Sequence, residues 1–138
     1  MSLDDRAAIR PIERPQSLGY DAFVNIEIIS RPITVEHLRG IADSQFGDMV
    51  KAVVDIEDKI MAIGGELHAD EEAELLARGS RQENLWGINL YVDEEAADWL
   101  EFDSMINVRP SQANKSRSVE DPALRARIAD VVNELVPR

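Results

Sequence analysis

Three alternating polar residues, Glu66, His68 and Asp70, form the most suggestive candidate site in the sequence. In an extended segment their side chains would lie on one side, because side chains alternate along a strand. A histidine between two carboxylates suits general acid–base catalysis or a divalent metal ion, which makes these three the candidate catalytic residues. In the alternative, which we favour, Glu66 ends a strand, Asp70 caps a helix and His68 packs between them. We expect no metal and no cofactor, since the chain has no cysteine and only two histidines.

A second candidate site lies on one face of two predicted strands, residues 85–92 and 99–109. An arginine beside carboxylates and amides could recognise a small polar ligand. The alternative, which we favour, is a solvated sheet face with cross-strand charge pairs. Trp86 belongs to the opposite, aliphatic face and is predicted in the core, whereas Trp99 is predicted to be exposed. The polar face comprises Asn89, Tyr91, Trp99, Glu101, Asp103, Asn107 and Arg109.

The loop at residues 109–118 is a third candidate site. Residues 104–118 contain no acid, but they include Arg109, Lys115 and Arg117 together with several hydroxyl side chains. Bases and hydroxyls just before a helix N-terminus could hold an anion. The loop has no glycine, which argues against a phosphate-binding P-loop. The alternative, a solvent-exposed connection, is the one we favour.

The charge of the chain is unevenly distributed. Residues 55–103 hold fifteen acidic and three basic residues, and the rest holds twelve of each, so the net charge of −12 belongs to the middle segment. A surface this acidic repels phosphate backbones, and we predict no general nucleic-acid binding. The same surface would suit a basic protein partner.

The first half of the chain predicts a strand, a helix and an ambiguous segment. Residues 22–29 alternate between apolar and polar types, as in a half-buried strand. Thr34 is a suitable N-cap for a helix that extends to about Phe46. Residues 48–65 fit either one helix or a β-hairpin. Three valines and three isoleucines between positions 50 and 63 favour the hairpin, with strands at 51–56 and 59–63.

The second half of the chain completes the predicted fold. Asp70 is expected to cap a short acidic helix that ends before Gly79. A six-residue connection between strands 85–92 and 99–109 favours an antiparallel pair, and Asp121-Pro122 opens the last helix. These elements predict an α+β fold in which an antiparallel sheet of about four to five strands has helices on one face and solvent on the other.

The length of 138 residues suits one domain. Residues 1–20 carry two prolines and no apolar period, so they are predicted to form a flexible N-terminal arm, and residues 21–138 a single α+β domain. No apolar run is long enough to span a bilayer, and the N-terminus has no signal-peptide pattern. We therefore expect a cytoplasmic protein without membrane association.

Three segments of the sequence form a distinctive set: residues 64–70 (Gly-Gly-Glu-Leu-His-Ala-Asp), 82–87 (Gln-Glu-Asn-Leu-Trp-Gly) and 106–112 (Ile-Asn-Val-Arg-Pro-Ser-Gln). Together they resemble a family of small bacterial proteins catalogued only as being of unknown function. The similarity extends from about Phe23 to Val136. The resemblance implies one compact domain and no established activity, cofactor or catalytic residue.

The function predicted from these observations is a non-enzymatic protein-binding or regulatory module of the bacterial cytoplasm. The competing hypothesis is a small metal-assisted or acid–base hydrolase centred on His68, so the sequence leaves enzymatic activity open. An enzyme would require His68, Glu66 and Arg109 to converge in one concave pocket. The N-terminal arm and an exposed Trp99 would also suit a homodimer, which we predict.

Overall fold

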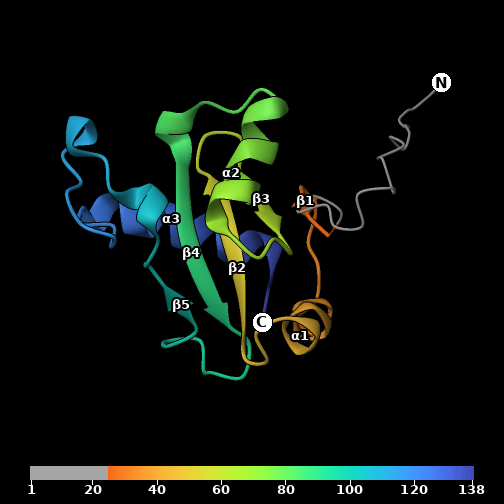
Figure 1. Ribbon diagram of the computed structural model, residues 1–138. Coiled ribbons are helices and arrows are strands. Elements are labelled where there is room, and N and C mark those ends of the chain that lie inside the picture. The colour runs from red at the N-terminus through yellow and green to blue at the C-terminus, as the bar shows by residue number, and fades with distance from the viewer. Residues whose placement is uncertain (1–24) are drawn as a thin grey trace.

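The computed structural model describes residues 25–138, which form three α-helices and a five-stranded sheet (Figure 1). The strands lie in the order β1-β3-β2-β4-β5, and each pairs with its neighbours antiparallel. This confirms the predicted α+β class. The predicted arm at residues 1–20 lies outside the described residues.

The elements are β1 (Glu27–Ile29), α1 (Val35–Ser44), β2 (Met49–Asp55), β3 (Ile60–Ile63), α2 (His68–Ala77), the 3₁₀ turn η2 (Gln82–Asn84), β4 (Leu85–Tyr91), β5 (Leu100–Glu101), the 3₁₀ turns η3 (Met105–Asn107) and η4 (Pro110–Gln112), and α3 (Pro122–Leu135).

Residues 48–65, whose sequence fits either a helix or a hairpin, form the hairpin that we predicted. β2 and β3 pair antiparallel, with Val53 opposite Ala62. Asp55 organises the turn between them, because its Oδ1 atom accepts the backbone N–H groups of Glu57 and Asp58, both at 2.9 Å. β-branched residues fit the pleated surface of a strand that is buried on both faces, which is why they indicated a hairpin here.

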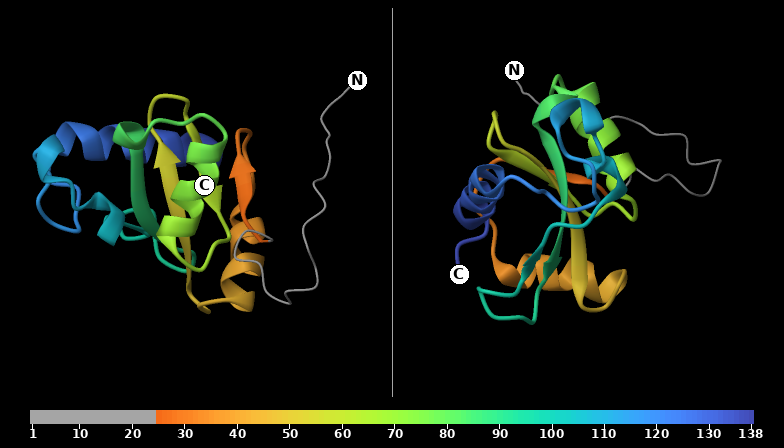
Figure 2. Two further views of the ribbon diagram at one scale, coloured as in Figure 1. Left: turned by 45° about the horizontal axis from the view of Figure 1, so that its top comes forward. Right: turned by 90° about the vertical axis from the view of Figure 1, so that its left-hand side faces the viewer.

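The main hydrophobic core lies between the sheet and helices α1 and α3, which pack on the same face (Figure 2). Both helices start as the sequence predicts. The Thr34 hydroxyl accepts the N–H of His37 at 3.1 Å, and the Asp121 carboxylate accepts the N–H of Ala123 at 2.9 Å. Such caps satisfy N–H groups that have no partner within the helix.

The opposite face of the sheet is covered by α2, so the predicted solvated face is wrong in its central part (Figures 1 and 2). Leu75 of α2 packs there on Val53, Ala62 and Leu85 in a second, smaller core. The reason is visible in the strand sequences: Ala52, Val53 and Val54 are consecutive, and such a run is typical of a strand buried on both sides. This second face carries the candidate site.

The predicted strand at residues 99–109 is also wrong, because β5 contains only Leu100–Glu101. At Ser104 the chain turns away from the sheet, where the serine hydroxyl accepts the N–H of Ile106 at 3.2 Å and starts η3. A local side-chain bond to the backbone competes here with the strand ladder.

Candidate functional site

Several of the polar residues singled out by the sequence fall into two groups, which both bond to β4. The first group, which we call the Arg109 corner, consists of Asn107, Arg109, Gln112 and Asn114. Its members bind backbone atoms of η2, β4 and the loop that follows η4. The second group surrounds His68 under the start of α2.

Arg109 is buried and holds the start of β4. Its guanidinium donates to the carbonyl oxygens of Gln82 and Leu85 and, at 3.1 Å, to Oε1 of Gln112. It also lies over the ring of Trp86, 3.9 Å from the ring centre. Burial lowers the pKa of Arg109 from its usual value. Because the guanidinium donates to two backbone carbonyls and to a side chain of the same molecule, we assign Arg109 a role in stabilising the fold.

Asn107 completes the ladder of β4 beyond the end of β5. Its Oδ1 atom accepts the N–H of Gly87 at 2.8 Å, and its Nδ2 atom donates to the Gly87 carbonyl at 3.0 Å. The amide thus takes the place of a neighbouring strand. No side chain fits at position 87, because a Cβ atom there would lie 2.6 Å from Cβ of Ser104.

The Arg109 corner joins residues 82–87 to residues 106–112, which are the second and third of the three segments that carry the family resemblance. Gln112 donates to the Glu83 carbonyl at 3.1 Å, so residues of segment 106–112 repeatedly bind the backbone of segment 82–87. Asn114 then closes the loop through the carbonyls of Asn107 and Ser118, both at 2.7 Å. These contacts support a structural role for the two segments.

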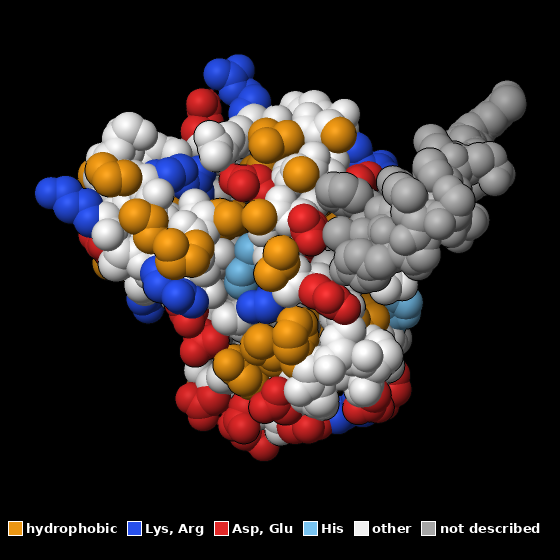
Figure 3. Space-filling view, in the orientation of Figure 1, with side chains coloured by type: hydrophobic (Ala, Val, Ile, Leu, Met, Phe, Trp, Pro, Cys, Tyr) orange, Lys and Arg blue, Asp and Glu red, His pale blue; other side chains and the backbone are white. Residues whose placement is uncertain are grey.

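The second group forms a hollow of about 220 Å³, which we call the His68 hollow. Figure 3 shows a face of the molecule on which hydrophobic and basic side chains lie side by side near the middle. Carboxylates gather instead at the lower end of this face. The hollow is lined by Lys51, Leu67, His68, Ala69, Ser104, Met105, Ile106 and Arg117.

His68 forms the inner wall of the hollow. It is the first residue of α2, and its Nε2 atom lies 2.8 Å from the carbonyl oxygen of Ile88. A carbonyl oxygen only accepts, so Nε2 carries the ring hydrogen. Burial lowers the pKa of His68 to about 4, against a smaller opposing effect of the Ile88 hydrogen bond, and the ring is neutral near pH 7. The histidine therefore anchors α2 to β4.

Asn89 lies on the sheet beneath His68, opposite Lys51 in the β2–β4 register. Its Nδ2 atom donates to a carboxylate oxygen of Glu101 at 2.9 Å and to the carbonyl of Asp103 at 3.2 Å. Its Oδ1 atom is buried and has no hydrogen-bond partner among the described residues. Tyr91 donates to the same Glu101 oxygen at 3.1 Å, so this part of the predicted polar face is a connected network.

Glu71 is a buried carboxyl group that sequence reasoning missed. Its side chain has no exposed surface, and its Oε2 atom accepts the N–H of Gly65 at 2.9 Å. Burial raises the pKa of Glu71 well above the usual value of a glutamate. The available signal was its position three residues after His68, which places both side chains on one face of α2. Its packing requires a glycine at 65, where a Cβ atom would lie 2.8 Å from Cγ of Glu71.

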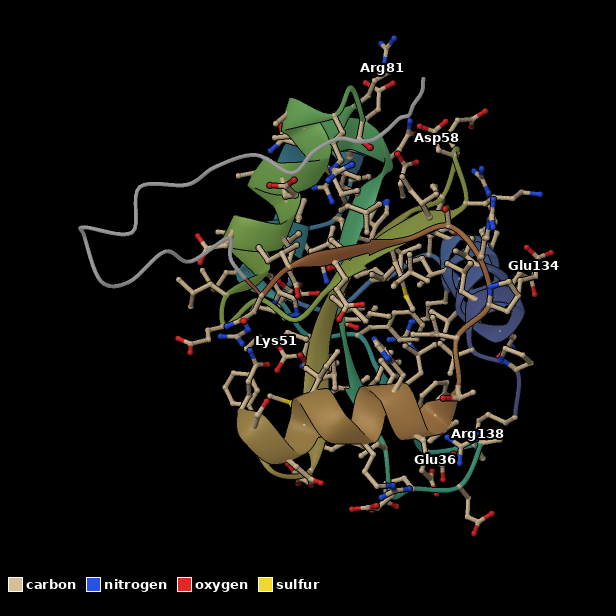
Figure 4. The ribbon with its side chains drawn as sticks, turned by 90° about the vertical axis from the view of Figure 1, so that its right-hand side faces the viewer. Glu36, Lys51, Asp58, Arg81, Glu134 and Arg138 are labelled. Carbon is tan, nitrogen blue, oxygen red and sulfur yellow. The ribbon has the colours of Figure 1, made fainter. Side chains whose placement is uncertain are left out.

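The outer part of the hollow combines cations with exposed apolar side chains. Lys51 extends from β2 on the α2 side of the sheet (Figure 4), with its ammonium 5.4 Å from the centre of the Phe46 ring. Arg117 contributes a second cation, and its Nε atom donates to Asp103 at 2.7 Å. Met105 is 66% exposed and Leu67 59% exposed, although both are large hydrophobic residues.

The remaining candidate residues do not join the hollow. Glu66 precedes α2 and Asp70 lies in its first turn, and neither lines the hollow. The prediction that Asp70 caps this helix is wrong, because the N-cap is Leu67 and no side chain caps it. Lys115 is exposed in its loop, and its N–H is bound by Glu120 at 3.1 Å.

Trp99 is buried, with only 2% of its surface exposed, so its predicted exposure is wrong. It precedes β5 and packs in the main core, where the guanidinium of Arg138 lies 4.6 Å from its ring centre. Strand alternation therefore did not apply at this position. Within residues 25–138, no group of three histidine or carboxylate side chains is placed to hold a metal ion.

The fold and the hollow define an α+β protein with a candidate binding surface on the α2 face of its sheet. The chain belongs to the family described as "Protein of unknown function (DUF5674)", whose model matches residues 27–135. This confirms the predicted membership of a family catalogued only as being of unknown function. No curated protein and no solved structure matches the chain. Within the described part of the chain, no helix has both the length and the apolar character needed to cross a membrane.

Proposed function

We propose that this chain is a non-enzymatic protein-binding module and that it binds its partner at the His68 hollow. The observation that carries the proposal is the exposure of Met105 and Leu67 at one hollow that also contains Lys51 and Arg117. Scattered exposed hydrophobic residues are ordinary, but apolar side chains gathered with an arginine are typical of protein interfaces. The proposal includes a location in the bacterial cytoplasm: the bacterial source rests on the family resemblance, and the cytoplasmic location on the expectation drawn from the sequence.

The hydrolase alternative has less support from the geometry. An active site would bring His68, Glu66 and Arg109 together, but only His68 lines the hollow. Arg109 instead donates to the carbonyl oxygens of Gln82 and Leu85. Because Nε2 of His68 donates its hydrogen to Ile88, only Nδ1 could act as a base, and neither Glu66 nor Arg109 lines the hollow beside it.

Site-specific photo-cross-linking tests the proposal. A photoreactive amino acid is placed at position 105 or 67 of the full chain, and at Leu76 as the control. Leu76 is an exposed leucine of α2 that does not line the hollow. We expect one protein to be cross-linked from positions 105 and 67 but not from 76. With that protein purified, Met105→Asp should weaken binding at least about tenfold, and Leu76→Asp should leave it unchanged.

Two results would decide against this interface. Equal cross-linking from position 76, or an affinity unaffected by Met105→Asp, would mean that the hollow is not where the partner binds. The predicted homodimer is included in the same test, because a second copy of the chain would be the cross-linked partner. Sedimentation would then show a dimer that Met105→Asp converts to the 15.5 kDa monomer.

A further inference from the structure

We infer that the His68 hollow binds the C-terminal residue of a partner chain, with its free carboxylate at Lys51 and Arg117 and an apolar last side chain between Leu67 and Met105. This inference rests on the proposed function and specifies the chemistry of the occupant. It is argued from the size of the hollow, its charge and the arrangement of its apolar side chains.

The size of the hollow limits the occupant. Its volume of about 220 Å³ is smaller than the roughly 300–1,000 Å³ of typical cofactor and drug-sized sites. A group of the size of one amino-acid residue suits this space. A long amphipathic helix would instead need a groove with several successive apolar positions.

The charge of the hollow favours an anion. Lys51 and Arg117 both line it, on a chain whose net charge is −12. Arg117 binds Asp103 through Nε, and a guanidinium has four further N–H donors on its two terminal nitrogens. His68 is neutral near pH 7, so the positive charge at the hollow comes from these two side chains.

The start of α2 adds to this preference. Leu67, His68 and Ala69 are the N-cap and the first two residues of the helix, and all three line the hollow. No side chain caps this terminus. The first N–H groups of a helix and the positive end of its dipole favour a negative charge. A carboxylate in the hollow would therefore lie near the helix terminus as well as the two cations.

The apolar side chains distinguish a C-terminal residue from an internal aspartate or glutamate. Leu67, Met105 and Ile106 share the small hollow with the cations, so the occupant must present an apolar group and a carboxylate close together. A C-terminal residue carries both on one Cα atom. An internal acidic residue has a peptide chain on each side and no apolar group of its own. Capture of a terminal carboxylate is an established mode of peptide recognition.

The test uses the full chain labelled with ¹⁵N and titrated with synthetic peptides. The probe is an acetylated hexapeptide of glycine and serine that ends in leucine with a free carboxylate. The matched probe has the same sequence and a C-terminal amide. We expect the free acid to shift the amide resonances of Ala69 and Met105 and to bind at least about tenfold more tightly than the amide.

Variants of the hollow complete the test. Lys51→Met and Arg117→Met should each weaken binding of the free acid by about fivefold or more, while Lys115→Met, an exposed lysine of the same loop region, should not change it. Methionine keeps the apolar stem of each side chain, and circular dichroism confirms that each variant is folded. Unchanged binding in both Lys51→Met and Arg117→Met would overturn the inference.

Three further outcomes overturn the inference separately from the proposed function. Equal binding of acid and amide would show that the carboxylate is not recognised. If 4-methylpentanoate alone binds as tightly as the peptide, the ligand is a free small acid. If neither peptide shifts the hollow resonances while position 105 still cross-links a protein, the proposed interface stands and its occupant is a different segment.

Discussion

The Arg109 corner and the His68 hollow are both built from polar residues against β4, but their polar atoms end in different places. In the corner, Arg109 and Asn107 donate to the backbone carbonyls of Gln82, Leu85 and Gly87 of the same molecule. At the hollow, Lys51 and Arg117 reach a partly exposed surface between apolar side chains. Arg109, which lies in the segment 106–112 of the family resemblance, therefore stabilises the fold. Lys51, which lies outside the three segments, lines the candidate binding surface.

The largest effect on stability is expected from Asn107→Ala in the corner. Asn107 has no exposed surface, and the substitution leaves the N–H and carbonyl of Gly87 without their partner. We expect a loss of about 3 kcal/mol or more in the free energy of unfolding, measured by urea denaturation. The control is Ser111→Ala at an exposed position of η4, which should stay within about 0.5 kcal/mol. A loss below about 1 kcal/mol for Asn107→Ala would contradict this account of the corner.

A pair of arginine substitutions compares the two regions directly. Arg109→Met removes charge-assisted donors from one buried and one partly buried carbonyl and should cost about 2–3 kcal/mol of stability. Arg117→Met removes a half-exposed ion pair with Asp103 and should cost less than about 1 kcal/mol. Both values come from urea denaturation at the same pH. Equal losses would remove the distinction between a structural arginine and a surface arginine.

His68→Ala should produce an intermediate and pH-dependent loss. At pH 7 the variant lacks the bond to Ile88 and leaves a small void, which should cost about 1–3 kcal/mol. Since burial lowers the pKa of His68 from 6.5 to about 4, the unfolded wild type takes up a proton below pH 6.5 that the folded protein does not. Wild-type stability should fall as the pH decreases from 6.5 to 4, by about 3 kcal/mol from this group.

The variant has no ring to protonate, so the stability advantage of the wild type over His68→Ala should decrease over the same pH range and disappear or reverse near pH 4. Subtracting the free energy of unfolding of the variant from that of the wild type removes the contribution of Glu71. That contribution is common to both proteins, and its dependence on pH is opposite to that of His68. The raised pKa of Glu71 means that the folded state retains a proton above pH 4.5, so stability from Glu71 is lost as the pH rises. A difference that does not change between pH 6.5 and 4 would show that the pKa of His68 is not lowered.

Local signals were sufficient for much of the fold. β-branched residues identified the β2–β3 hairpin, and Asp121-Pro122 marked the start of α3. Long-range contacts explain the failures. The alternating pattern of residues 99–109 resembles a strand, but Ser104 turns the chain and Asn107 replaces a strand by its amide. Nothing in the local pattern indicates that such a side chain will bond the edge of β4.

The candidate site could be predicted only in part for the same reason. His68 was identified from its own chemistry, and its interpretation as a packed residue agrees with its burial and its bond to Ile88. Lys51 reaches the hollow through the register of β2 against β4, and Met105 reaches it through the turn at η3. The positions of Lys51 and Met105 both depend on residues that are distant in sequence. Neither residue lies in a sequence pattern that would mark it as part of a site.

The smallest expected effect is that of added zinc on the hollow. Within residues 25–138, no cluster of three potential ligands is placed to hold a metal ion. We expect excess Zn²⁺ or Mn²⁺ to leave the melting temperature of the wild type unchanged, as measured by differential scanning fluorimetry. A ligand that binds the folded state raises this temperature by mass action, so the measurement is sensitive to weak binding.

The informative quantity in this experiment is the change in melting temperature caused by the metal, compared between the wild type and the variants. His68→Ala lowers the melting temperature whether or not the site binds metal, so the shift caused by the mutation alone decides nothing. A rise in the wild type that disappears in both His68→Ala and Glu66→Gln would assign the metal to this cluster. That result would restore the hydrolase hypothesis and place a catalytic group in the hollow. A rise that persists in both variants would place the metal elsewhere on the acidic chain, and the hollow would keep the binding role that its cations and apolar side chains support.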